Sequence, residues 1–163
     1  MKILIVCYSF SGNTKRACLF LKENLKPSNS VDFIDLRPKK ETSSFLGQCK
    51  EAFFKNSPDL LDCNYDLGSY EFIVFASPVW AFTVAPALRA YLNQIKNIEN
   101  KKFGCLLTYG SGAGAGKALN YLVESLKHKN GKHVFSKNIC GHKTKMRAYL
   151  ADELMPLVKA INA

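Results

Sequence analysis

Hydroxyl and amide side chains gather around one glycine directly after the first apolar stretch of the chain, Lys2 to Tyr8. A helix start exposes backbone N–H groups, and hydroxyls beside it add donors for an anion. No lysine lies in this stretch, so a phosphate here would be a monoester that anchors a ligand and is not transferred. An ordinary turn capped by Ser or Thr is the alternative interpretation. The candidate residues are Ser9, Phe10, Ser11, Gly12, Asn13 and Thr14.

The only tryptophan of the chain, Trp80, follows a second apolar stretch, Phe72 to Ala76. An indole stacks on a flat heteroaromatic ring with about 0.5 to 1.5 kcal/mol beyond area burial. Backbone groups of the same loop can bind the polar edge of such a ring. The alternative is that Trp80 and Phe82 cap the edge of the core. The candidate residues are Pro78, Val79, Trp80, Ala81, Phe82 and Thr83.

A glycine-rich stretch follows a third apolar run, Phe103 to Tyr109. Glycines at alternate positions remove side chains where a ligand must approach the backbone closely. The stretch is not a Walker A loop, because Ser111 stands where the first glycine belongs and Ala118 where Ser or Thr belongs. The candidate ligand contacts are Thr108, Tyr109, Gly110, Ser111 and Gly112.

A dinucleotide fingerprint is a second alternative for the same glycines. The pattern G-x-G-x-x-A fits Gly110, Gly112 and Ala115. The acidic residue expected about 20 positions later is missing, and the pattern stands in the fourth strand–helix unit instead of the first. The fingerprint is therefore a weak indication of dinucleotide binding.

Strand-like and helix-like periodicities alternate five times along the chain. This pattern predicts a single α/β domain over residues 1–163, with a five-stranded parallel sheet covered by helices on both faces. Ligands of such sheets bind beyond the carboxyl ends of the strands, where all three stretches lie. The predicted strands are Lys2–Tyr8, Val31–Leu36, Phe72–Ala76, Phe103–Tyr109 and Val134–Ile139. The predicted helices are Thr14–Lys26, a stripe of Phe45, Cys49, Ala52 and Phe53, then Ala85–Ile95, Lys117–Lys127 and Thr144–Ile161.

Composition agrees with a soluble globular chain. Hydrophobic residues make up 47% of the sequence and aromatic residues 12%, which excludes a disordered protein. No apolar run approaches the roughly 20 residues that a membrane span needs. The six cysteines show no C-x-x-C spacing, which favours a reducing cytoplasm and indicates no metal site.

The net charge of +10 is concentrated in the second half of the chain. The span Lys127 to Arg147 contains seven basic residues and no acidic one. A solvated lysine-rich surface explains this charge, and a docking face for an acidic partner is the alternative. Specific nucleic-acid binding is not expected, because Phe135 is the single aromatic residue within the span.

The first stretch resembles the FMN-phosphate loop of the flavodoxin family, whose pattern Ser/Thr-x-Ser/Thr-Gly-x-Thr matches Ser9, Ser11, Gly12 and Thr14. Ser77-Pro78-Val79-Trp80 is similar to the flavin loop of many flavodoxin-like proteins. The resemblance spans nearly the whole chain and lacks the insertion of the long-chain subgroup. It implies a flavodoxin-like three-layer sandwich, sheet order 2-1-3-4-5, and FMN bound by the candidate residues of all three stretches.

The resemblance implies electron transfer through non-covalently bound FMN, with a redox partner protein. An NAD(P)H-dependent FMN or quinone oxidoreductase is the alternative, and the basic charge favours it over docking on a basic reductase. A flavodoxin-shaped binding module without a redox role is another alternative. No residue is singled out as a proton-transfer catalyst, and His142 is interpreted as a solvated surface histidine.

Overall fold

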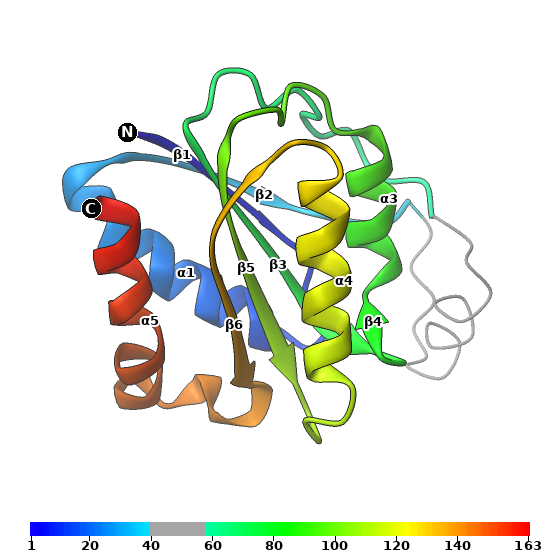
Figure 1. Cartoon of the computed structure of the whole chain (residues 1–163). Helices are drawn as coiled ribbons and strands as arrows, with labels where there is room; N and C mark the ends of the chain where they lie inside the picture. The colour runs from blue at the N-terminus through cyan, green and yellow to red at the C-terminus, as the bar shows by residue number, and fades with distance from the viewer. Residues whose placement is uncertain (40–57) are drawn as a thin grey trace.

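Five parallel strands and four α-helices are found in the part of the chain that the computed structural model describes, residues 1–39 and 58–163 (Figure 1). The helix predicted over Phe45, Cys49, Ala52 and Phe53 lies outside these residues. The strands are β1 (Lys2–Cys7), β2 (Ser30–Asp35), β3 (Phe72–Trp80), β4 (Thr83–Val84), β5 (Lys102–Tyr109) and β6 (Lys132–Cys140). The α-helices are α1 (Asn13–Leu25), α3 (Pro86–Gln94), α4 (Ala115–Lys127) and α5 (Arg147–Asn162), with 3-10 helices η1 (Lys26–Ser28) and η2 (Gly141–Lys145).

The main sheet has the order β2-β1-β3-β5-β6, and all of its pairs are parallel. Counted along the chain without the short β4, this is the order 2-1-3-4-5, so that prediction is confirmed. The order in which successive strands are added to the sheet reverses between β1 and β3: β2 lies on one side of β1, and β3 and the later strands lie on the other. The carboxyl ends of β1, β3, β5 and β6 consequently meet at one edge of the domain.

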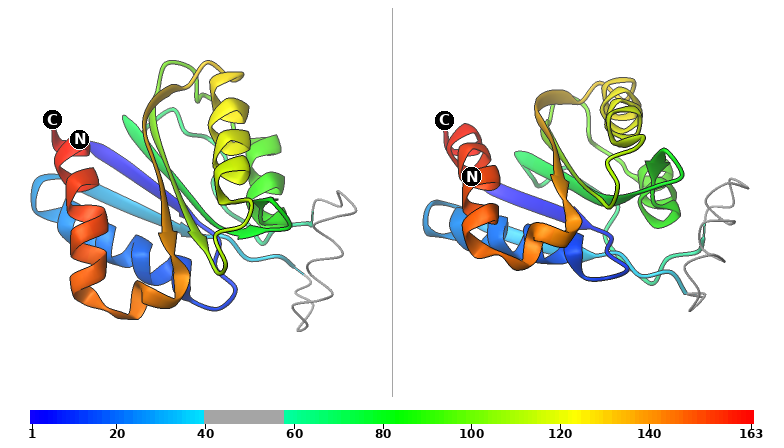
Figure 2. Two further views of the ribbon diagram at one scale, coloured as in Figure 1. Left: turned by 60° about the horizontal axis from the view of Figure 1, so that its bottom comes forward. Right: turned by 90° about the horizontal axis from the view of Figure 1, so that it is seen from below.

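Strand β1 is apolar at every position after Lys2 because both of its faces are buried. Leu4 and Val6 belong to the core under α3 and α4, whereas Ile3, Ile5 and Cys7 belong to the core under α1 and α5. Successive side chains of a strand point to opposite faces, so a strand covered on both faces needs apolar residues at every position. Figure 2 shows the resulting three layers, with α1 and α5 on one side of the sheet and α3 and α4 on the other.

The structure corrects the prediction that the third strand ends at Ala76. β3 continues to Trp80 and turns back into β4, with antiparallel pairs Val79–Val84 and Trp80–Thr83. The last partner of β3 on the β1 side is Cys7, opposite Ala76, so Ser77 and Pro78 pair only with β5. A proline is tolerated where one side of a strand has no ladder, which is why Pro78 does not end β3.

The chain after β6 also differs from the prediction. The helix expected to begin at Thr144 begins at Arg147, and Gly141–Lys145 form η2 instead. Among the described residues, no helix has the length and apolar character needed to cross a membrane.

Candidate functional site

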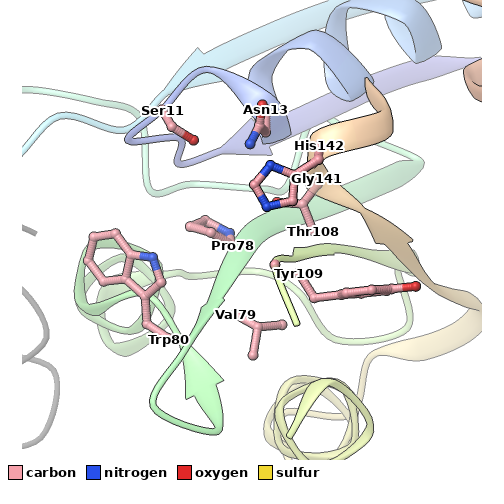
Figure 3. A pocket seen from close by; sticks show the side chains of 10 residues that line it. Ser11, Asn13, Pro78, Val79, Trp80, Thr108, Tyr109, Gly141 and His142 are labelled. Carbon is pink, nitrogen blue, oxygen red and sulfur yellow. The ribbon is translucent and has the colours of Figure 1, made fainter. Parts of the chain in front are cut away.

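A cavity of about 260 Å³ opens at the carboxyl edge of the sheet (Figure 3). It is bounded by the ends of β3 and β5, the start of α1 and the residues after β6. Eight of its lining residues are among the sequence candidates: Ser11, Asn13, Pro78, Val79, Trp80, Thr108, Tyr109 and Gly110. The lining is completed by Gly141 and His142. Residues that are far apart in sequence thus form one site, as the parallel topology requires.

The start of α1 has no side-chain cap. Gly12 precedes the helix with φ 83°, and the described residues form no side-chain capping hydrogen bond there. Such a start leaves backbone donors available to an anion. The Ser9 hydroxyl lies beside it, buried and without a hydrogen-bond partner among the described residues. An orphaned hydroxyl next to an uncapped helix start fits a ligand with several acceptor oxygens, such as a phosphate.

Thr14 was expected to offer its hydroxyl to the ligand, but in the structure this hydroxyl is hydrogen-bonded to Thr108. Its side chain is buried and does not line the cavity. The Thr14 Oγ1 atom lies 2.7 Å from Thr108 Oγ1, which does belong to a lining residue. This hydrogen bond ties the loop after β1 to the end of β5, beneath the cavity.

Replacing either threonine of this pair by valine is expected to lower the free energy of unfolding by about 1 to 3 kcal/mol, because the remaining hydroxyl stays buried without a partner. The double replacement Thr14→Val with Thr108→Val should cost less than the sum of the two single changes. Urea denaturation of the three variants measures these costs. Strictly additive costs would show that the two hydroxyls do not interact.

Trp80 lies at the end of β3 with its indole mostly buried. Its ring is perpendicular to that of Tyr8, with centroids 5.7 Å apart, and close to perpendicular to that of Phe10, at 6.0 Å. Figure 3 shows Trp80 and Tyr109 on either side of Val79. Two aromatic side chains therefore border the cavity, while Phe10 itself packs on Trp80 and does not line it.

The turn between β3 and β4 directs three candidate residues away from the cavity. Ala81 and Phe82 both have positive φ, 45° and 65°, as a tight two-residue hairpin turn requires. The lining does not include them or Thr83. Phe82 instead covers Gly114, where an added Cβ would lie 2.2 Å from the Phe82 ring.

Only part of the glycine-rich stretch after β5 lines the cavity. Tyr109 and Gly110 line the cavity, whereas Ser111 and Gly112 are exposed outside it. Gly114 is needed because Phe82 lies against it and because its φ is 75°. Part of the glycine content therefore serves the packing of the hairpin and not the approach of a ligand.

Sequence reasoning missed the contribution of the segment after β6. His142 is exposed, as expected, but it also lines the cavity, which was not expected. Gly141 packs so closely that an added Cβ would lie 3.2 Å from Asn13 Nδ2 and from the Tyr109 carbonyl oxygen. The signal was present, since the loop after the fifth parallel strand must lie at the same edge as the other three loops.

The comparison with protein-family models shows to which family the chain belongs. The model described as NADPH-dependent FMN reductase matches residues 1–144. The chain belongs to this family. The prediction of FMN as the cofactor is confirmed at this level, while the resemblance to flavodoxins is refined to the reductase type. A search of curated protein sequences found no match.

Solved structures show the same fold at low sequence identity. A flavoprotein from Lactobacillus acidophilus, solved in complex with FMN, superposes with a TM-score of 0.73 at 18% identity, covering 90% of this chain and 98% of that one. The two-electron reduced flavodoxin of Megasphaera elsdenii gives 0.66 at 15% identity, covering 97% and 96%. The azoreductase AzrA gives 0.59 at 16% identity, covering 98% of each chain. These similarities confirm the flavodoxin-like fold of this FMN reductase family member.

Proposed function

We propose that the chain binds FMN in the cavity at the carboxyl edge and acts as an NAD(P)H-dependent oxidoreductase with a flavin or quinone as acceptor. The observation that carries the proposal is the cavity itself, which has the uncapped start of α1 at one part and two aromatic side chains at another. The orphaned Ser9 hydroxyl lies outside the lining, in the loop that leads to this helix start. The family match supports the reductase over a pure electron carrier.

The residues divide into an anchor and a ring site. Ser9, Ser11 and the first N–H groups of α1 would hold the phosphate, with Gly12 leaving the approach open. Trp80 and Tyr109 would contact the ring, and the backbone of Val79 and Gly110 would bind its polar edge. FMN held there would supply the redox chemistry, which is uptake of a hydride from a reduced nicotinamide and release of electrons to an acceptor.

The electrostatics of the cavity favour a nicotinamide cofactor as donor. None of the ten residues that line it is acidic, and the chain carries a net charge of +10. NADPH is strongly anionic, so a site without carboxylates does not repel it, and the positive surface speeds encounter. The same charge slows association with a basic protein partner.

The proposal predicts a flavin-binding protein whose colour is bleached by NADPH. The purified chain, supplied with FMN, should retain the visible absorption of flavin after gel filtration. FMN should also quench the emission of Trp80, which is the only tryptophan of the chain and lines the cavity. Under anaerobic conditions NADPH should bleach the flavin absorption, and addition of a quinone should restore it.

The outcomes separate the alternatives. A chain that stays colourless and keeps its tryptophan emission in the presence of FMN contradicts flavin binding altogether. A yellow chain that NADPH does not bleach, but that dithionite does, contradicts the reductase and leaves electron transfer to a protein partner. Saturation with FMN at 100 times its Kd should raise the free energy of unfolding by about 2.7 kcal/mol.

A further inference from the structure

Two basic side chains from outside the hydroxyl-rich loop lie near this part of the site, Arg16 against the turn before α1 and His142 in the cavity lining. Arg16 lies one turn into α1, and its Nη2 atom donates a hydrogen bond to Asn13 Oδ1. Its Nη1 atom is 3.2 Å from the position that a Cβ on Gly12 would occupy. The guanidinium group therefore lies directly against the turn that precedes the helix.

His142 reaches the cavity from the segment that follows β6. Its Nε2 atom lies 4.0 Å from the Cβ position of Gly110, and the preceding residue, Gly141, packs against Asn13. Figure 3 shows the imidazole extending from the end of β6 toward Pro78, below Asn13. The imidazole is thus placed over the cavity between the start of α1 and the end of β5.

The segment that carries His142 is fixed on both sides. The Thr144 hydroxyl, which is buried, donates to the Gly141 carbonyl oxygen at 2.8 Å. The Cys140 N–H donates to the Tyr149 hydroxyl oxygen at 2.8 Å. A side chain on such a segment needs little further ordering when it binds a ligand.

Two donor atoms near the start of α1, on residues just outside the cavity lining, lack an acceptor. Arg16 Nε and Ser9 Oγ are both buried without a hydrogen-bond partner within residues 1–39 and 58–163. The residues that line the cavity contribute no carboxylate to pair with His142. Arg16 lines a second pocket, and the acidic residue of that pocket, Glu23, is paired with Arg147. Buried polar groups are normally satisfied, so these donors indicate an anion with several oxygens.

We propose that His142 and Arg16 supply the basic charge that binds the 5′-phosphate of FMN, a role that the hydroxyl-rich loop alone does not fill. The proposal rests on the proposed function. His142 is the direct ligand, because an imidazole N–H lies at the cavity and donates to a phosphate oxygen. Arg16 is a positioning residue that orients Asn13 and adds its charge behind the turn.

Riboflavin tests this assignment, because it has the ring of FMN but no phosphate. Quenching of flavin fluorescence by the flavin-free full chain gives the Kd of each ligand. His142→Gln should weaken FMN binding by about ten- to a hundredfold, the range for a lost hydrogen bond to a charged group. Riboflavin binding should change by less than about twofold, since no charged hydrogen bond is lost. Arg16→Met should likewise raise the Kd of FMN and leave the Kd of riboflavin nearly unchanged.

Salt gives a second readout that a purely structural role would not move. Raising the ionic strength from about 0.01 M to 1 M shortens the screening length from about 30 Å to 3 Å. The preference of the wild-type chain for FMN over riboflavin should fall with salt. The preference of His142→Gln should depend on salt much less.

Two matched variants control for loss of a histidine or of a charge. His128→Gln changes an exposed histidine at the end of α4. Lys145→Gln removes an exposed charge from the same short helix, η2, without touching the cavity. Both should keep the wild-type ratio of the two dissociation constants.

The result that overturns the assignment is distinct from failure of the proposed function. If the wild-type chain binds neither flavin, both proposals are wrong. If it binds FMN more tightly than riboflavin and His142→Gln keeps that preference, the assignment of His142 alone is wrong. An increase in the KM for NADPH with an unchanged FMN Kd would also overturn it, by placing His142 at the nicotinamide phosphate.

Discussion

Gly104→Ala is expected to lower the free energy of unfolding by about 2 to 4 kcal/mol, a large loss for a chain of this size. Gly104 is buried in β5, next to the irregularity in its pairing with β6. A Cβ at this position would lie 2.2 Å from the Cε1 and Cζ atoms of Phe135. The Phe135 ring is itself buried and stacked on Phe72, with centroids 6.0 Å apart. The new methyl group must displace this ring from the core.

Urea denaturation of Gly104→Ala should be compared with a second glycine replacement that meets no neighbour. Gly116 lies in the first turn of α4, and an added Cβ there has open space. Gly116→Ala should stabilise the chain by about 0.5 to 1 kcal/mol, because alanine loses less backbone entropy than glycine in a helix. Equal effects of the two replacements would contradict the steric explanation.

A double variant isolates the contact between Gly104 and Phe135. Phe135→Val alone removes buried ring atoms and should destabilise the chain. Combined with Gly104→Ala, its cost should be smaller than the sum of the single costs, because the methyl group occupies space that the ring has left. Additive costs would show that the Phe135 ring is not what opposes the side chain.

The layout of the sheet could be predicted because one physical pattern determines it. The apolar residues of β1 belong to both cores, whereas the apolar faces of α1 and α4 each belong to one. A strand buried on both faces is therefore apolar at successive positions, and a helix buried on one face is apolar at every third or fourth position. Parallel strands with right-handed crossovers then bring the loops after β1, β3 and β5 to one edge. Eight of the ten residues that line the cavity were candidates on this basis.

The missed features depend on contacts between residues distant in sequence. Nothing local shows that Thr14 pairs with Thr108, or that Gly114 leaves room for Phe82. The third strand was expected to end at Ala76, and only the short reach of β1 explains why β3 continues through Pro78. His142 was judged by its basic neighbours in sequence instead of by the end of the strand that positions it.

Trp80→Ala is expected to weaken the binding of FMN and of riboflavin alike, by about ten- to a hundredfold, as loss of a stacked aromatic does for other flat ring ligands. Trp80 lines the cavity and is held by edge contacts with Tyr8 and Phe10. Its indole therefore has a fixed position before the ligand arrives. Flavin fluorescence titration measures both dissociation constants, and their ratio should stay at the wild-type value.

Trp80→Phe separates ligand contact from loss of core packing, since Trp80→Ala also removes a mostly buried side chain at a cost of about 3 to 5 kcal/mol. The phenyl ring keeps an aromatic face at the cavity, so flavin binding should weaken by less than about fivefold for the smaller ring. Tyr121→Ala, which removes an exposed aromatic side chain from α4, is the control and should leave both constants unchanged. If Trp80→Ala folds and weakens FMN but not riboflavin, the indole acts at the phosphate and not at the ring. The contrast with His142→Gln then assigns each end of the cavity, because one variant changes the ratio of the two constants and the other changes both constants together.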